Sequence, residues 1–243
     1  MPKILAIIPA RGGSKGVPRK NIVPLNGKPM IYYTIKVAQE CKLLDRVILT
    51  SEDAEIIETA KALGLEVPFV RPTHLAEDHV AERPVLQHAV NALMEKESYD
   101  PDFIVCLKPN IPFRSTEDIT NAITKWQALS SDSVRTVTTA EGVHHPYWMF
   151  TKDEQGMATP LIEDKTIDQY YQRQLLPPVY SLNGAVDGIQ TDILMRHKKY
   201  YGDRMALLEI PKSRAIDIDT LDDLDYARYI MQKNNSENVG KDR

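Results

Sequence analysis

The chain alternates short apolar runs with longer segments of helical periodicity, and this alternation limits the folds open to it. Strands that alternate with helices are typical of a parallel sheet covered by helices. The predicted strands are 4–8, 46–50, 66–70, 103–107, 133–138, 205–210 and 215–218. The predicted helices are 30–42, 54–63, 84–97, 116–129, 190–201 and 221–233. We therefore expect an α/β fold, and 243 residues suffice for one large domain of this kind.

The first apolar run leads directly into a loop rich in glycine and basic residues. Gly12, Gly13 and Gly16 allow sharp turns and bring backbone N–H groups close to an anion. The spacing excludes a Walker A loop, because Gly16 and not Ser or Thr follows Lys15, and it does not match the dinucleotide pattern G-x-G-x-x-G. The basic residues of the loop are Arg11, Lys15, Arg19 and Lys20. The sequence therefore predicts a polyphosphate site after the first strand.

A pair of carboxylates near the end of the chain is the second strong signal. Asp217 and Asp219 are two residues apart in an extended segment, so their side chains are expected on one face. Two carboxylates together with substrate phosphates are typical ligands of Mg²⁺. Alternatively, both belong to the acidic start of the following helix, where Thr220 and Asp223 fit a capping box. That alternative does not explain Asp217 and Asp219, which precede the cap.

Composition and charge exclude several classes of protein. The formal net charge of −4 argues against nucleic acid or an anionic membrane as the main partner. Cys41 and Cys106 are the only cysteines and lie in apolar contexts, as expected of buried thiols in a reducing compartment. The first apolar run has the length of a strand and not of a signal peptide, and no stretch approaches a transmembrane span. We expect a cytoplasmic, soluble protein.

The rhythm of strands and helices breaks over residues 141–180, which are rich in Pro, His, aromatic and polar residues. A connection this long inside a compact domain is usually functional or forms a subdomain. The polar tail, 234–243, is expected to be disordered.

Motifs spread along the whole chain resemble those of the N-acylneuraminate cytidylyltransferases, the CMP-sialic acid synthetases. The resemblance begins with Ala10–Gly16, Lys20-Asn21 and Leu25–Pro29. It continues in collinear order through Arg71-Pro72, Leu75-Ala76, Pro112, Arg114, His145-Pro146, Arg173-Gln174, Leu176-Pro177, Asn183–Ala185 and Ile216–Asp219. Together these motifs are specific and cover nearly the whole chain.

The resemblance implies a Rossmann-like, mostly parallel sheet flanked by helices, of the nucleotide-diphospho-sugar transferase type. It implies a single cytidylyltransferase domain over 1–243, in which 141–180 form a dimerisation subdomain reaching the partner's active site in a homodimer. CTP and a 2-keto sugar acid would be the substrates, with Mg²⁺ or another divalent cation as cofactor. The implied nucleotide-binding residues are Arg11, Gly12, Gly13, Ser14, Lys15, Lys20, Asn21 and Arg71. The implied metal ligands are Asp217 and Asp219, and the implied substrate-binding residues are Lys108, Arg173, Asn183 and Asp187.

The departures from the family pattern gather on the sugar side of the site. Lys108 replaces a glutamine expected to meet the sugar, Trp148 replaces a lysine after His-Pro, and Asp187 replaces an aromatic residue. Residues 81–83 replace small hydroxyl residues near the cytosine. The acid is therefore left open among nine-carbon acids: neuraminic, legionaminic and pseudaminic acid.

The expected reaction is attack of the anomeric hydroxyl of the acid on the α-phosphorus of CTP, which releases pyrophosphate. Arg11, Lys15 and Lys20 would hold the leaving pyrophosphate, and together with Asp217 and Asp219 they are the predicted catalytic residues. The sequence names no general base, and metal-assisted deprotonation of the hydroxyl is the hypothesis. Three alternatives stay open: a synthetase for the eight-carbon acid Kdo, a glycosyltransferase that uses Asp217 and Asp219 for its metal, and a nucleotide-binding protein without catalysis.

Overall fold

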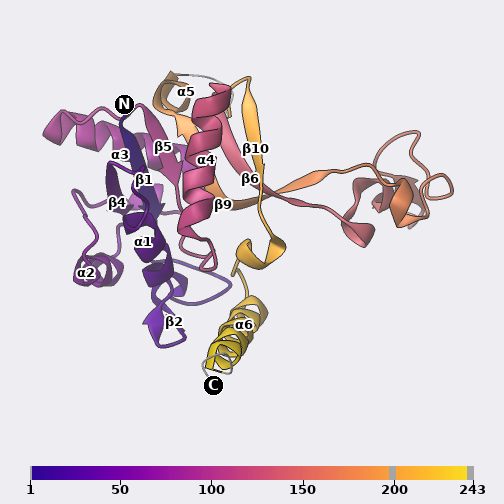
Figure 1. Ribbon diagram of the computed structural model, residues 1–243, viewed down its shortest axis with the longest axis horizontal. Coiled ribbons are helices and arrows are strands. Elements are labelled where there is room, and N and C mark those ends of the chain that lie inside the picture. Colours follow the sequence, from indigo (N-terminus) through magenta and orange to yellow (C-terminus); the bar gives the residue numbers. More distant parts are fainter. Residues whose placement is uncertain (1, 197–200, 240–243) are drawn as a thin grey trace. The chain divides into compact units, whose positions relative to one another are not determined.

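The computed structural model describes residues 2–196 and 201–239, and it confirms the expected α/β fold (Figure 1). The strands are β1 (Ile4–Pro9), β2 (Pro24–Leu25), β3 (Lys28–Pro29), β4 (Arg46–Thr50), β5 (Phe103–Cys106), β6 (Ser133–Thr139), β7 (Phe150–Lys152), β8 (Ala158–Pro160), β9 (Tyr180–Gln190) and β10 (Met205–Glu209). The α-helices are α1 (Ile31–Gln39), α2 (Ala54–Ala62), α3 (Glu82–Glu97), α4 (Thr116–Leu129), α5 (Thr191–Arg196) and α6 (Leu221–Val239). The chain divides into two compact units, Met1–Thr136 with Asn183–Arg243, and Val137–Leu182.

The main sheet has six strands in the order β10-β6-β9-β5-β1-β4. Strand β1 runs parallel to both neighbours, with Ile7 opposite Ile48 of β4 and Cys106 of β5. Parallel neighbours place the carboxyl ends of β1, β4 and β5 at one edge, where open α/β sheets bind ligands. Strand β9 is antiparallel to β5, so Asp187 lies opposite Cys106 near this edge.

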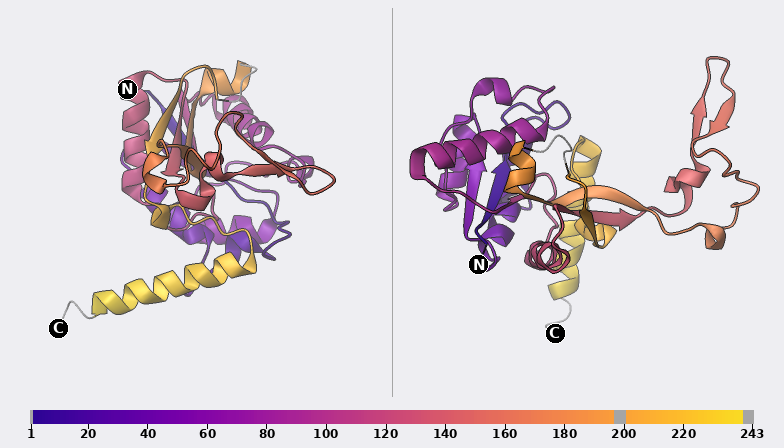
Figure 2. Two further views of the ribbon diagram at one scale, coloured as in Figure 1. Left: turned by 90° about the vertical axis from the view of Figure 1, so that its right-hand side faces the viewer. Right: turned by 90° about the horizontal axis from the view of Figure 1, so that it is seen from above.

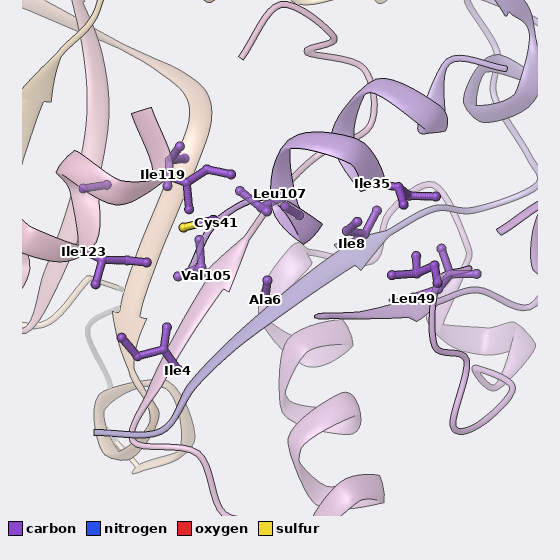
Figure 3. Packing of buried hydrophobic residues seen from close by; sticks show 14 of the residues in the cluster. Ile4, Ala6, Ile8, Ile35, Cys41, Leu49, Val105, Leu107, Ile119 and Ile123 are labelled. Carbon is purple, nitrogen blue, oxygen red and sulfur yellow. The ribbon is translucent and has the colours of Figure 1, made fainter. Parts of the chain in front are cut away.

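Strand β1 is buried on both faces, as its continuous apolar sequence requires. Ile4, Ala6 and Ile8 pack in one core cluster with residues of α1, α2 and α4, part of which is drawn in Figure 3. Leu5 and Ile7 point to the opposite face and pack in a second cluster with residues of α3 and α5. The period of two along the strand therefore divides the core into two layers.

The long strand β9 was not predicted, because glycines interrupt its apolar pattern. Gly188 is required by its neighbour, since a Cβ at this position would lie 2.6 Å from Cζ of Phe103. The Phe103 ring in turn stacks on Trp126 of α4, with ring centroids 3.8 Å apart. Glycine inside a strand often marks such a close approach.

Two predicted strands are wrong. Residues 66–70 make one isolated bridge, between Glu66 and Ile48, because Pro68 has no N–H to continue a ladder. Residues 215–218 stay irregular, and Ile218 donates its N–H to the carbonyl of Asn110. The predicted boundaries also shift: α3 begins at Glu82 and not at Pro84, and α5 is described only to Arg196.

Helix α6 is the last element and is seen along its length in the left view of Figure 2. Thr220 and Asp223 form the predicted cap: the Thr220 N–H donates to Asp223 Oδ2 (2.8 Å), and the Asp223 N–H donates to Thr220 Oγ1 (3.2 Å). The helix continues to Val239, beyond the predicted end at 233. Residues 240–243 of the predicted tail lie outside the described residues. Across 2–196 and 201–239, no helix has the length and apolarity needed to cross a membrane.

The second unit is built from short elements and local contacts. Strands β7 and β8 pair antiparallel, with Thr151 opposite Thr159. Trp148 Nε1 donates to the carbonyl of Tyr170 at 2.6 Å, and a ring nitrogen of His145 lies 3.0 Å from the carbonyl oxygen of Pro177. The predicted insertion, 141–180, falls within this unit.

Candidate active site

The glycine-rich loop leaves the carboxyl end of β1 and is held by close backbone approaches. A Cβ at Gly16 would lie 1.9 Å from the carbonyl oxygen of Asp219, so only glycine fits where the loop touches the acidic segment. The N–H of Gly12 donates to Glu52 Oε1 at 2.7 Å. Glu52 follows β4, so the neighbouring strand fixes the start of the loop.

The cations in and after the loop are paired with carboxylates. Asp78 bridges Arg11 (2.9 Å) and Lys15 (2.7 Å), and these two cations hold the pKa of Asp78 below its usual range. Lys20 Nζ lies 2.6 Å from Asp219 Oδ1. The remaining cation of the loop, Arg19, pairs with Asp53 at the start of α2 (2.6 Å) and with Glu55. Arg11 and Lys15 thus meet at one carboxylate, Lys20 and Arg19 meet others, and all four cations are paired.

A pocket of about 350 Å³ opens beside this loop. Its lining includes five predicted site residues: Arg11, Lys20, Asn21, Arg71 and Lys108. Further polar residues of the lining are Glu77, Asp78, Glu82 and Asn110, and its apolar residues include Leu75, Val80 and Val85. A larger cavity of about 830 Å³ lies by Asp102 and Thr191, at the amino ends of the parallel strands, and its described lining contains none of the predicted site residues.

Asn21 and Arg71 are fixed before any ligand arrives. Asn21 is buried and donates through Nδ2 to the carbonyl of Arg11 at 2.9 Å. The side chain of Arg71 is 3% exposed and pairs with Glu52 Oε2 at 2.6 Å. Glu52 therefore links Arg71 to the N–H of Gly12 through its two oxygens. Such preorganisation lowers the cost of ordering the site on binding.

Asp217 and Asp219 share one amide donor. Asn110 Nδ2 donates to Asp217 Oδ1 and lies 3.4 Å from Asp219 Oδ1. Burial, together with the neighbouring Asp219, raises the pKa of Asp217 to about 6. In the described part of the chain, no group of three or more His, Cys, Asp and Glu side chains could hold a metal ion by itself. Two carboxylates suit Mg²⁺ if phosphate oxygens of the substrate complete its ligand set. A cation bound there would also relieve the repulsion between the two carboxylates.

Two of the unusual sugar-side residues are in contact. Lys108 Nζ lies 3.2 Å from Glu82 Oε2 and 3.6 Å from Asp187 Oδ2. Asp187 also pairs with Arg135 at 2.6 Å, and the Arg135 guanidinium lies over the ring of Tyr201. Burial alone would lower the pKa of Lys108, but Glu82 and Asp187 raise it above its usual range. Lys108 and Glu82 line the pocket, so this part of its wall is ionic, and Asp187 and Arg135 extend the ion pairs beyond the lining.

Buried Arg114 supports that wall through hydrogen bonds to its backbone. The side chain is buried, and burial lowers its pKa to about 10. It donates to the carbonyls of Ala185 and Lys108, the latter at 2.7 Å, and to Thr34 Oγ1 at 3.2 Å. It therefore holds the backbone of Lys108 next to the backbone of β9.

We expect Arg114→Met to lower the free energy of unfolding by about 3 kcal/mol, because buried carbonyls lose their donor. The change is measured by urea denaturation, with Arg228→Met as the control. Arg228 is half-exposed, pairs with Asp225 three residues away and makes one long hydrogen bond to the carbonyl of Pro24 (3.4 Å), so its loss should cost less than about 1 kcal/mol. Equal stabilities of the two variants would contradict the supporting role of Arg114.

The remaining predicted residues lie in three places. Gly13 and Ser14 belong to the loop, and a Cβ at Gly13 would meet open space. Asn183 Oδ1 accepts the N–H of Ala185 at 3.1 Å, and its Nδ2 is buried without a hydrogen-bond partner. Arg173 belongs to the second unit, where its guanidinium lies next to Gly142. A Cβ added to Gly142 would lie 3.5 Å from Cζ of Arg173.

The sequence analysis did not predict which side chains pair with the site residues. Asn110, Glu52, Asp78 and Glu82 each contact a predicted site residue. A usable signal existed for Glu52, which follows a predicted strand at its carboxyl end, where ligands bind. The other three follow no repeating pattern, so their pairing appears only in the folded chain.

Comparison with known proteins decides the family. A family model described as "Cytidylyltransferase" matches residues 5–240, nearly the whole chain. The chain belongs to this cytidylyltransferase family. It is therefore a nucleotidyltransferase, and the glycosyltransferase alternative is not supported.

Relatives of this cytidylyltransferase carry related activities in their names. It is 30% identical over 234 residues to the pseudaminic acid cytidylyltransferase of Campylobacter jejuni, and the matched region covers 96% of this chain and 97% of the relative. It is 30% identical over 237 residues to the CMP-N,N'-diacetyllegionaminic acid synthase of Legionella pneumophila, with 96% and 97% covered. Among solved structures, a CMP:2-keto-3-deoxy-manno-octonic acid synthetase complexed with CTP superposes with a TM-score of 0.71. That structure covers 96% of this chain and 99% of its own, and at 16% identity the likeness shows the fold alone.

Proposed function

We propose that the enzyme transfers the cytidylyl group of CTP to the anomeric hydroxyl of a nine-carbon 2-keto sugar acid, a sialic acid-like nonulosonate. The oxygen of that hydroxyl attacks the α-phosphorus, the bond from the α-phosphorus to the bridging oxygen breaks, pyrophosphate leaves and the hydroxyl proton is lost. The grouping of cations after β1 carries this proposal: Arg11 and Lys15 meet at Asp78, Lys20 meets Asp219, and Arg11, Lys20 and Asp78 line one pocket. Names of relatives that act on pseudaminic and legionaminic acid support the substrate class.

Each part of the site has a role in this proposal. Arg11, Lys15 and Lys20, with the N–H groups of Gly13 and Ser14, hold the β- and γ-phosphates and neutralise the charge that develops on pyrophosphate. Asn21 and Arg71 hold the cytidine. Lys108, Asn183 and Asp187 face the sugar acid, and Arg173 is offered to its carboxylate, in this proposal by the neighbouring subunit.

Asp217 and Asp219 would hold a Mg²⁺ ion or another divalent cation. A cation there supplies Lewis-acid chemistry, since it neutralises charge on the α-phosphate and favours loss of the hydroxyl proton. Positioning by the chain supplies the rest, because a phosphoryl-type transfer needs little covalent work from the protein.

We also propose a homodimer and a cytoplasmic location. The second unit exposes large apolar side chains, among them Val143 (70% exposed), Met157 (68%) and Tyr171 (63%), as expected of a surface that meets another chain. Light scattering after gel filtration tests the dimer: an assembly of two chains is expected, and a monomer at micromolar concentration would contradict it.

The proposed cytoplasmic location is supported by the cysteines. Both are buried free thiols, which fits a reducing compartment.

The proposed reaction is tested by pyrophosphate release from CTP and Mg²⁺ with purified acids. The panel contains neuraminic, legionaminic, pseudaminic and Kdo-type acids. Turnover with a nine-carbon acid supports the proposal and identifies the substrate. Turnover with the Kdo-type acid alone would favour the eight-carbon alternative. CTP binding without release of pyrophosphate would favour an acid outside the panel or a binding protein without catalysis.

We expect Asp78→Asn to strengthen CTP binding about two- to fivefold, because the triphosphate no longer competes with a carboxylate for Arg11 and Lys15. Titration calorimetry measures the dissociation constant. Glu77→Gln, which removes a neighbouring negative charge, serves as the control and should change it less. Weaker binding by the Asp78 variant would contradict the competition.

A further inference from the structure

Glu82 places a carboxylate in the pocket at a fixed position. It is the first residue of α3, a helix of 16 residues, and the helix N-terminus favours a negative charge there. Its Oε2 lies 3.2 Å from Lys108 Nζ, and its side chain is 20% exposed. Val85, one turn along the same helix, lines the same pocket. Glu82 is therefore directed toward the pocket and held there by Lys108.

The part of the pocket around Glu82 suits a nucleobase. Leu75, Val80 and Val85 supply its apolar lining, and all three lie within ten residues of Glu82. Among the groups that the two proposed substrates bring to the site, the pyrimidine ring of CTP is flat and largely apolar. The triphosphate and the sugar acid are charged or hydroxylated. Arg71, the residue proposed to hold the cytidine, lines the same pocket. The base therefore fits beside Glu82, with its edge turned to the carboxylate.

A carboxylate at this edge separates the two common pyrimidines. An ionised carboxylate only accepts hydrogen bonds. Cytosine presents its N4 amino group as a donor to such an acceptor, whereas uracil presents the O4 acceptor at the same place. The Arg71 guanidinium only donates, and both pyrimidines have an O2 acceptor for it, so Arg71 does not distinguish them.

We propose that Glu82 selects cytosine by accepting a hydrogen bond from its N4 amino group, and that Lys108 positions Glu82 for this contact. The proposal rests on the proposed use of CTP and adds the residue that rejects UTP. Asp187, paired with Arg135, holds the other side of Lys108 and so completes the support.

The test is titration calorimetry of CTP and of UTP, without any sugar acid, on the wild-type protein, Glu82→Gln and Glu77→Gln. We expect the wild-type protein to prefer CTP at least about tenfold. The Glu82→Gln variant should lose most of this preference, because an amide side chain presents either an acceptor or a donor. Glu77 lines the same pocket and pairs with His79, so Glu77→Gln should keep the preference.

An unchanged preference for CTP over UTP in a folded Glu82→Gln protein would overturn the proposal. If the variant does not fold, the triphosphate of 2-pyrimidinone riboside, which lacks the amino group, replaces it as a probe of the wild-type protein. It should bind at least about tenfold more weakly than CTP, and equal binding would overturn the proposal. Because no acid is present, these outcomes are separate from the failure of every acid to release pyrophosphate.

Discussion

Replacing both Asp217 and Asp219 with Asn should lower the rate of pyrophosphate release about a thousandfold. The two carboxylates lie close enough to share the Asn110 amide, and they are the proposed ligands of the divalent cation. Without them the charge on the α-phosphate is no longer neutralised. Steady-state kinetics at saturating Mg²⁺ measures the rate, and Mn²⁺ binding followed by electron paramagnetic resonance measures the loss of the metal site.

Two further measurements separate this effect from loss of structure. The double variant should melt near the wild-type temperature, because the lost repulsion between two neighbouring carboxylates offsets the lost ion pair between Asp219 and Lys20. Asp222→Asn, an exposed position in the first turn of α6, should keep wild-type activity. Full activity of the double variant would rule out both the metal site and metal-assisted deprotonation.

The second large effect is expected from Gly16→Ala. A Cβ at this position would lie 1.9 Å from the carbonyl oxygen and 3.1 Å from the carbonyl carbon of Asp219, and backbone atoms have little freedom to move away. The loop and the acidic segment must then separate. We expect kcat/KM to fall about a hundredfold, as displacements of about 1 Å in a site can cost. We also expect a loss of about 2 kcal/mol in the free energy of unfolding, typical of overpacking.

Gly13→Ala is the matched control for stability in the same loop. A Cβ at Gly13 meets nothing within 4 Å, so the free energy of unfolding should change by less than about 0.5 kcal/mol. Kinetics and urea denaturation of the Gly16 variant are measured side by side with it. Wild-type kinetics in Gly16→Ala would mean that the loop and the Asp219 segment move independently.

The sequence predicted the elements whose residues repeat with a clear period. Strand β1 is apolar on both faces and was predicted within one residue of its observed end at Pro9. Strand β9 was missed because its conformation depends on distant residues: Gly188 is needed only because Phe103 lies against it. The run 66–70 misled for the opposite reason, since its apolar residues suggest a strand while Pro68 removes a ladder donor.

The candidate site was predictable in its cations and acids but not in their pairing. Glycine and basic residues after a strand indicate phosphate binding by their chemistry, whatever their partners. That Asp78 would bridge Arg11 and Lys15, or that Glu82 would meet Lys108, depends on loops whose course no local pattern sets. The contact between Glu82 and Lys108 joins two departures from the family pattern that lie 26 positions apart in the sequence.

The carboxylates that pair with the loop cations make nucleotide binding an exchange of partners. When a triphosphate approaches Arg11 and Lys15, it takes the place of Asp78 rather than of a cloud of solution anions. In such an exchange the Asp78 side chain gives up the two cations as the triphosphate binds them, and few ions are released to the solvent. Its affinity for CTP should consequently fall less steeply with added salt than that of bare surface cations, and the carboxylates keep the vacant loop from collecting unrelated anions.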